Sequence, residues 1–174
     1  MLTGNKIGLT ELRYEDSETL FAWINDPAIV RFNAPYAPVH EPSHSAWLKQ
    51  VTTDPSRIVF GIRDIEGLRL VGIVQLIDLH QIHRSAELII RIGSDTDRGR
   101  GLGTEAVKLA IEFGFRHRNL QRIWLRVFAD NLRAIRAYEK AGLQREGTLQ
   151  RACFIDGKWQ DEVVMAILAD STDD

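Results

Sequence analysis

Arg98-Gly99-Arg100-Gly101-Leu102-Gly103-Thr104 joins two segments whose hydrophobic patterns differ. The apolar run 86–92 before it predicts a β-strand, and the amphipathic run 105–115 after it predicts an α-helix. Glycines allow positive φ angles and let a ligand approach the backbone amides closely. The first N–H groups of the following helix lack intrahelical partners and lie at the positive end of its dipole. With its two arginines, the stretch therefore predicts an anion site suited to a pyrophosphate.

The glycine spacing distinguishes this stretch from two other phosphate-binding motifs. Gly99, Gly101 and Gly103 do not fit the dinucleotide-binding pattern G-x-G-x-x-G, because its third glycine is missing. The Gly-Lys-Ser/Thr ending of a P-loop is missing as well. A flexible glycine turn with solvated arginines is the plain alternative, and these seven residues alone leave both interpretations open.

The hydrophobic pattern along the rest of the chain predicts a mixed α and β domain. Besides the strand before the glycine turn, strands are expected at Ile7–Arg13, Ile58–Arg63, Leu70–Ile77, Arg122–Phe128, Gln144–Ala152 and Trp159–Leu168. Besides the helix after the turn, helices are expected at Ser43–Val51, at Asn131–Ala141, and from a cap at Asp16 or Ser17 to Ile24. The polar tail Asp170–Asp174 is expected to be frayed.

The second informative segment is Asn131-Leu132-Arg133-Ala134-Ile135-Arg136-Ala137-Tyr138-Glu139-Lys140-Ala141-Gly142-Leu143. Gly142 is a typical residue to end its helix. Asn131, Ile135 and Tyr138 are spaced i, i+4 and i+7, so they share one helix face. In purely structural terms, Asn131 would be an N-cap and Tyr138 an aromatic residue at the core boundary.

Together the two segments resemble the GNAT N-acetyltransferases. The first matches Arg/Gln-x-x-Gly-x-Gly/Ala, the pattern with which that family binds the pyrophosphate of acetyl-CoA, at Arg98, Gly101 and Gly103. The second is similar to the family pattern Asn-x-x-Ala-x-x-x-Tyr-x-Lys-x-Gly-Phe/Leu. Shorter stretches, among them 71–76, 83–87 and 146–151, are similar to the branch that contains the ribosomal-protein N-terminal and spermidine N-acetyltransferases.

The resemblance implies one α/β domain over residues 1–174 with the GNAT fold. This fold has a mixed, mostly antiparallel sheet of about seven strands, with helices on both faces. The resemblance also implies acetyl-CoA as the co-substrate and Tyr138 as the acid that protonates the leaving thiolate. The residues implied to bind acetyl-CoA are Ile90, Arg91, Ile92, Arg98, Gly99, Arg100, Gly101, Leu102, Gly103, Thr104 and Asn131.

The implied reaction is N-acetylation of a primary amine by direct transfer in a ternary complex. A small-molecule amine, either a polyamine or an amino sugar, is the first choice of acceptor, and a protein N-terminus, such as that of a ribosomal protein, is the second. A non-catalytic acyl-CoA-binding module is the alternative of another class. Tyr138 argues against such a module, because a protein that only binds has no use for a leaving-group acid.

Glu87 and the segment His40-Glu41-Pro42-Ser43-His44 are two further candidates for chemistry. Glu87 opens the strand before the glycine turn, and it is either a solvated strand end or a catalytic group that binds the amine and accepts its proton. The second segment spells H-E-x-x-H, a zinc motif, but Pro42 favours the start of a helix, which would leave His40 outside it. We therefore expect no metal site.

Length, composition and net charge limit the class of protein to which this chain can belong. A chain of 174 residues is long enough to bury a sizeable core, and its single cysteine excludes an internal disulfide. The net charge of −2 argues against a nucleic-acid partner, and no apolar run is long enough to span a membrane. We expect a cytoplasmic protein, and a homodimer in which the last two strands cover an exposed sheet edge.

Overall fold

The computed structural model describes residues 1–51 and 53–170, so four residues of the expected frayed tail lie outside the described part. The strands are β1 (Leu2–Thr3), β2 (Ile7–Thr10), β3 (Ile58–Asp64), β4 (Leu70–His80), β5 (Ser85–Ile92), β6 (Arg122–Phe128), β7 (Gln144–Ile155) and β8 (Lys158–Leu168). The helices are α1 (Asp16–Ile24), α2 (Pro27–Val30), α3 (Glu41–Val51), α4 (Leu102–Arg118) and α5 (Leu132–Lys140), with a 3₁₀ turn η1 at Asp95–Asp97.

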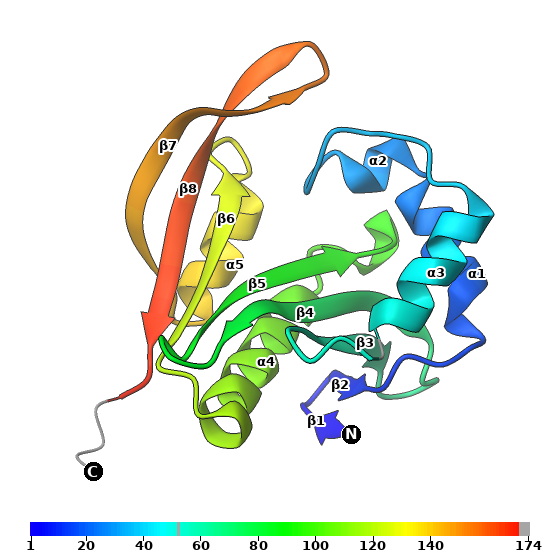
Figure 1. Cartoon of the computed structure of the whole chain (residues 1–174), viewed down its shortest axis with the longest axis horizontal. Coiled ribbons are helices and arrows are strands. Elements are labelled where there is room, and N and C mark those ends of the chain that lie inside the picture. Colours follow the sequence, from blue (N-terminus) through cyan, green and yellow to red (C-terminus); the bar gives the residue numbers. More distant parts are fainter. Residues whose placement is uncertain (52, 171–174) are drawn as a thin grey trace.

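The strands form one mixed sheet in the order β1-β2-β3-β4-β5-β6-β8-β7 (Figure 1). Every neighbouring pair is antiparallel except β5 and β6, which run parallel. The sheet therefore has one strand more than the expected seven. The extra strand, β1, has two residues, which is too short for an alternating pattern to reveal it.

Helices cover both faces of the sheet, as expected. Residues of α4, and Ile135 of α5, pack with the strands into the main hydrophobic core. On the opposite face, Leu20 of α1 and Trp47 of α3 pack against Leu70 and Ile73 of β4 in a smaller cluster. Because both faces are packed, the sheet holds the start of α4 and the end of β5 in fixed positions.

The sheet opens in its middle. The two parallel strands β5 and β6 pair only from Ser85 with Arg122 to Glu87 with Trp124, at the beginning of both strands. Beyond these pairs β5 stays with β4, whereas β6 continues with β8, so the two halves of the sheet diverge (Figure 1). Residues of β5 after Glu87 thus have one edge without a neighbouring strand.

Several local expectations differ from the structure. Strand β2 ends at Thr10 and not at Arg13, and the loop after α1 holds a short helix, α2, that was not expected. Asp26 caps α2 by accepting a hydrogen bond from the N–H of Ala28 at 2.8 Å. The tryptophans are expected in the core or a pocket wall, but Trp159 is 60 % exposed because it lies on the projecting β7–β8 hairpin.

No helix among residues 1–51 and 53–170 is long and apolar enough to cross a membrane. The expected cytoplasmic location stays a prediction.

Candidate active site

A cleft that both sequence motifs line lies where β5 and β6 diverge. It has a volume of about 300 Å³ and is bounded by the end of β5, the glycine turn, α5 and the segment around α2. Ten of the residues named from the sequence line it: Ile90, Arg91, Ile92, Arg98, Gly99, Gly101, Gly103, Thr104, Asn131 and Tyr138. Elements that are far apart in the chain thus bring the two sequence motifs to one cavity.

Side chains take the place of a neighbouring strand along the open edge of β5. The N–H of Gly93 bonds to Val71 of β4, so by strand alternation the backbone groups of Ile90 and Ile92 point to the open edge. Asn33 donates to the carbonyl of Ile90 at 3.3 Å, and Arg98 donates to the carbonyl of Ile92 at 3.2 Å. The two carbonyls are therefore paired, while the N–H groups of the same residues face the cleft side.

The glycine turn offers backbone amides with open space in front of them. Gly99 and Gly101 have φ angles of +79° and +85°, which L side chains rarely adopt. A Cβ added to Gly99 would meet no atom within 4 Å, and one added to Gly101 would meet only the Nζ of Lys6, at 3.8 Å. Gly101 is the N-cap of α4 and has no side-chain cap, so the first N–H groups of α4 remain available to an anion.

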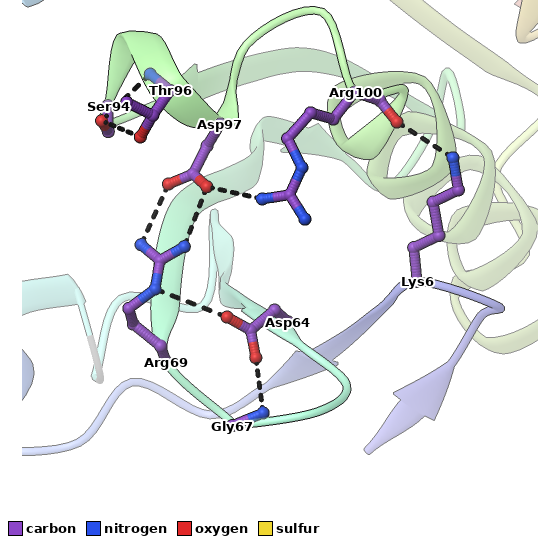
Figure 2. A network of polar contacts seen from close by, with 8 residues as sticks. All are labelled: Lys6, Asp64, Gly67, Arg69, Ser94, Thr96, Asp97 and Arg100. Carbon is purple, nitrogen blue, oxygen red and sulfur yellow. Dashed lines mark hydrogen bonds and ion pairs between the residues drawn. The ribbon is translucent and has the colours of Figure 1, made fainter.

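A buried carboxylate anchors this turn to the β3–β4 hairpin (Figure 2). Asp97 is 2 % exposed and accepts two hydrogen bonds from Arg69, at 2.9 and 2.8 Å, and one from Arg100 at 3.0 Å. Arg69 also pairs with Asp64 at 3.4 Å. The hydrogen bonds from Arg69 hold the pKa of Asp97 below its usual value. Burial acts to raise this pKa, but the hydrogen bonds and the positive charge of Arg69 outweigh it.

The two arginines of the turn are engaged within the protein. Arg98 pairs with Asp95, and its guanidinium lies 5.0 Å from the ring centroid of Phe32. Arg100 pairs with Asp97, and the backbone carbonyl of Arg100 accepts a hydrogen bond from the Lys6 side chain at 3.1 Å. Their first function in this structure is thus to shape the turn, and its backbone amides are the groups left for a ligand.

Helix α5 presents Tyr138 to the cleft from the side opposite β5. Asn131 caps this helix by accepting a hydrogen bond from the N–H of Ala134 at 3.2 Å, so it has the N-cap role in addition to lining the cleft. The Tyr138 hydroxyl makes no hydrogen bond with the described residues. Burial raises the pKa of Tyr138 to about 12, so the hydroxyl keeps its proton at neutral pH.

Some cleft residues were missed from the sequence. Arg133, Arg136 and Lys140 line the cleft from the exposed side of α5 and add three cationic side chains to it. Their spacing of three and four residues could have revealed this helix face. Phe32 and Asn33 also line the cleft, but they lie in an irregular loop that carries no periodic signal.

Three residues named from the sequence do not line the cleft. Leu102 is buried in the main core, and the Arg100 side chain is bound to Asp97. Glu87 is 8 % exposed, so it is not the solvated strand end that was one of its two interpretations. It lies at the last β5–β6 pair and bonds to Arg126 of β6, with 3.3 Å between Nε and Oε1.

The H-E-x-x-H segment makes packing contacts between α3 and α1 through one of its histidines. Helix α3 begins at Glu41, so His40 precedes it, as Pro42 led us to expect. His44 lies within α3, where its Nε2 contacts Ser17 of α1 and its ring stacks on Trp47. The described residues contain no group of three or more His, Cys, Asp and Glu side chains that could hold a metal.

Comparisons with known proteins agree with this geometry. The model of the acetyltransferase (GNAT) domain family matches residues 6–144. The spermidine N(1)-acetyltransferase of Escherichia coli K12 is 31 % identical over 169 residues, which cover 96 % of this chain and 88 % of that protein. The [ribosomal protein uS5]-alanine N-acetyltransferase of the same strain is 26 % identical over 146 residues, covering 78 % and 75 %.

A solved structure of a spermidine N-acetyltransferase has the same fold. The spermidine N-acetyltransferase from Vibrio cholerae, in complex with CoA and spermine, superimposes with a TM-score of 0.86. Its sequence is 29 % identical to this one, and the match covers 94 % of this chain and 95 % of that chain.

Proposed function

The chain belongs to the GNAT family of N-acetyltransferases, and from that premise we propose that it transfers the acetyl group of acetyl-CoA to a primary amine of a polyamine. One observation carries the proposal: the cleft between β5 and α5 has open backbone amides at the glycine turn and a protonated Tyr138 at its wall. The backbone amides suit the phosphates of acetyl-CoA, and the Tyr138 hydroxyl suits the thiolate that leaves when the acetyl group is transferred.

The donor's phosphates fit the glycine turn. The free space over Gly99 and Gly101 admits a pyrophosphate, and the N–H groups at the start of α4 point their positive dipole end at it. Arg133, Arg136 and Lys140 supply charge on the facing helix. In the V. cholerae relative of known structure, CoA is bound.

The edge of β5 suits the thioester. The N–H groups of Ile90 and Ile92 face the cleft side without a strand partner, as argued from the alternation of β5. An amide in this position stabilises the oxyanion that forms when an amine attacks the thioester carbonyl. Collapse of that intermediate forms the amide and releases a thiolate, which the Tyr138 hydroxyl protonates.

The acceptor must be neutral when it attacks, so its ammonium proton has to leave first. Glu87 is the carboxylate that we assign to the acceptor side, because it lies where β5 and β6 begin to diverge. A water molecule between Glu87 and the amine is sufficient to carry the proton to bulk solvent. Direct transfer in a ternary complex then needs no covalent enzyme intermediate.

A polyamine is preferred as the acceptor because of the relatives. The E. coli relative that matches nearly the whole chain is a spermidine N(1)-acetyltransferase, and the structural neighbour is bound to spermine. N-terminal acetylation of a protein is the second candidate, favoured by the relative that acetylates an alanine of ribosomal protein uS5.

The test is thiol release from acetyl-CoA with a panel of acceptors: spermidine, spermine, glucosamine, and a peptide with an N-terminal alanine. We expect turnover with the polyamines at the highest kcat/KM. Faster turnover of the peptide would replace the polyamine proposal by the second candidate. Acetyl-CoA binding without turnover of any acceptor would contradict both.

We also propose that the protein is a homodimer. Strand β7 is the edge of the sheet and pairs only with β8 among the described strands. The β7–β8 hairpin exposes Leu149, Phe154 and Trp159, and it projects from the rest of the molecule (Figure 1). An unpaired edge with exposed apolar side chains suits a second copy of the chain.

A further inference from the structure

A group of ionisable side chains lies on the face of the sheet opposite α4, next to the opening between β5 and β6. It consists of Glu87 on β5, Arg126 on β6, Glu162 on β8 and Cys153 on β7. Their neighbours Ala86, Leu125 and Val163 belong to the core under α4, so by strand alternation Glu87, Arg126 and Glu162 point to the other face, where the Cys153 thiol bonds to Glu162. On this face of the sheet, α1 and α3 pack against β4.

The charges of this group do not balance. Among residues 1–51 and 53–170, Arg126 is the one cation that contacts the two carboxylates, at 3.3 Å from Glu87 and 3.7 Å from Glu162. Glu162 is 7 % exposed, and its Oε1 accepts a hydrogen bond from the Cys153 thiol at 3.2 Å. Its Oε2 is buried and has no hydrogen-bond partner among the described residues. A buried carboxylate oxygen without a donor is unfavourable, so Oε2 of Glu162 is an acceptor available to a further donor.

Arg126 interacts only weakly with Glu87 and Glu162. Its side chain is 45 % exposed, its contact with Glu87 is long for a charged hydrogen bond, and its distance to Glu162 exceeds hydrogen-bond range. Burial acts to lower the pKa of Arg126, but the charges of Glu87 and Glu162 outweigh it and raise the pKa. The guanidinium therefore stays charged, and it can swing into solvent without breaking a short bond.

A second cavity adjoins the donor cleft and lies beside this group, whose four side chains are not among its lining residues. Its lining includes Phe128, which pairs with Glu162 across β6 and β8, and Gln160, which precedes Glu162 by two residues on the same face. It shares Phe32, Asn131 and Arg133 with the lining of the donor cleft. An acceptor that spans from the donor cleft toward Glu162 therefore needs cationic groups several bonds apart.

We propose that Glu162 binds a non-reacting ammonium group of the acceptor, and that Arg126 occupies this place in the free enzyme as an internal competitor. The inference rests on the proposed polyamine function, because it requires an acceptor with at least two cationic nitrogens. Displacement of Arg126 exchanges a half-exposed guanidinium for an ammonium group that donates a hydrogen bond to the buried Oε2 of Glu162.

The test uses opposite effects of two substitutions on the KM for spermidine. Glu162→Gln keeps the shape and removes the charge, and we expect KM to rise by about tenfold. Arg126→Gln removes the competitor, and we expect KM to fall by a factor of about three or more. Both variants should keep the wild-type Kd for acetyl-CoA, measured by calorimetry. Glu146→Gln, which breaks the Arg122–Glu146 pair outside the group, is the matched control and should leave KM unchanged.

The outcomes separate this inference from the proposed function. Wild-type turnover of spermidine with an unchanged KM in Glu162→Gln would overturn the inference alone. A higher KM in Arg126→Gln would show that Arg126 is a structural partner and would also overturn it. Absence of spermidine turnover by the wild type would overturn the proposed function and the inference together. A monoamine acceptor provides the last check, because its KM should be the same in Glu162→Gln as in the wild type.

Discussion

At the scale of single residues, burial suits Tyr138 to the general-acid role that we propose for it. An unperturbed tyrosine loses its proton near pH 10, whereas burial raises the pKa of Tyr138 to about 12. The hydroxyl therefore remains an acid over the whole range in which an amine acceptor is increasingly neutral. It has no hydrogen-bond partner among the described residues, so its proton is free to go to a leaving group.

We expect Tyr138→Phe to lower kcat by about 10²-fold, because it removes the general acid and keeps the ring. The Kd for acetyl-CoA should stay within a factor of about two, since the phosphate contacts are elsewhere in the cleft. Steady-state kinetics and calorimetry on the same preparation check this. Wild-type kcat should not decline between about pH 8 and about pH 10, because the raised pKa keeps Tyr138 protonated there. A variant as fast as the wild type would leave Tyr138 only its packing role.

At the scale of elements, the glycine turn depends on a contact from another part of the sheet. Arg69, which directly precedes β4, bonds to Asp97 in η1, and Asp97 in turn bonds to Arg100 in the glycine turn (Figure 2). Arg69 does not line the cleft, whereas Asp97 does. The contribution of Arg69 to acetyl-CoA binding is therefore indirect. Arg69 orients the glycine turn and neutralises the Asp97 carboxylate, which lies beside the proposed phosphate position.

We expect Arg69→Gln to weaken acetyl-CoA binding by about fivefold, with the larger effect at low salt. Both consequences of the substitution weaken binding, because the turn loses its anchor and the negative charge of Asp97 loses one of its two compensating cations. Calorimetry at two salt concentrations measures the effect. Arg116→Gln removes the same charge from an exposed i, i+4 pair on α4 and is the control. Equal affinities in the two variants would show that the anchor does not matter.

At the scale of the whole molecule, the open edge of β7 sets the expected assembly. Phe154 and Trp159 pack edge to face with 5.4 Å between their ring centroids, yet both are more than half exposed. Aromatic pairs of this kind are costly to leave in water and are enriched in interfaces.

We expect light scattering at micromolar concentration to give about twice the 19.8 kDa mass of the chain. Trp159→Arg should shift the mass toward the monomer, because it places a charge in the covered surface. Ile82→Ser, at an exposed position of the β4–β5 turn, is the control and should leave the dimer intact. A wild-type monomer at this concentration contradicts the proposal.

Local sequence pattern was sufficient for most elements and for the donor cleft. Strand β6 has the predicted ends, and the predicted end of α1 and start of β7 are also correct, because alternation and turn residues act over a few positions. The predicted cap of α1 is wrong: the N-cap is Glu15, without a side-chain cap, and the carboxylate of Asp16 pairs with Arg63 instead. The glycine turn and α5 carry the two motifs that resemble the GNAT family, so this resemblance predicted Gly101 and Tyr138 as site residues, and both line one cleft. The two-residue strand β1 and the loop at Phe32 have no such periodic signal.

The site that we propose for the acceptor can be recognised only from the tertiary structure. Glu87 and Arg126 are separated by 39 positions in the chain, and Glu162 comes from a third strand. They meet because β8 returns beside β6, and because β5 and β6 pair for only three residues before they diverge. Whether a carboxylate is solvated or buried depends on what the sheet places over it. The charge imbalance around Glu162 is therefore a property of strand order, which no local pattern encodes.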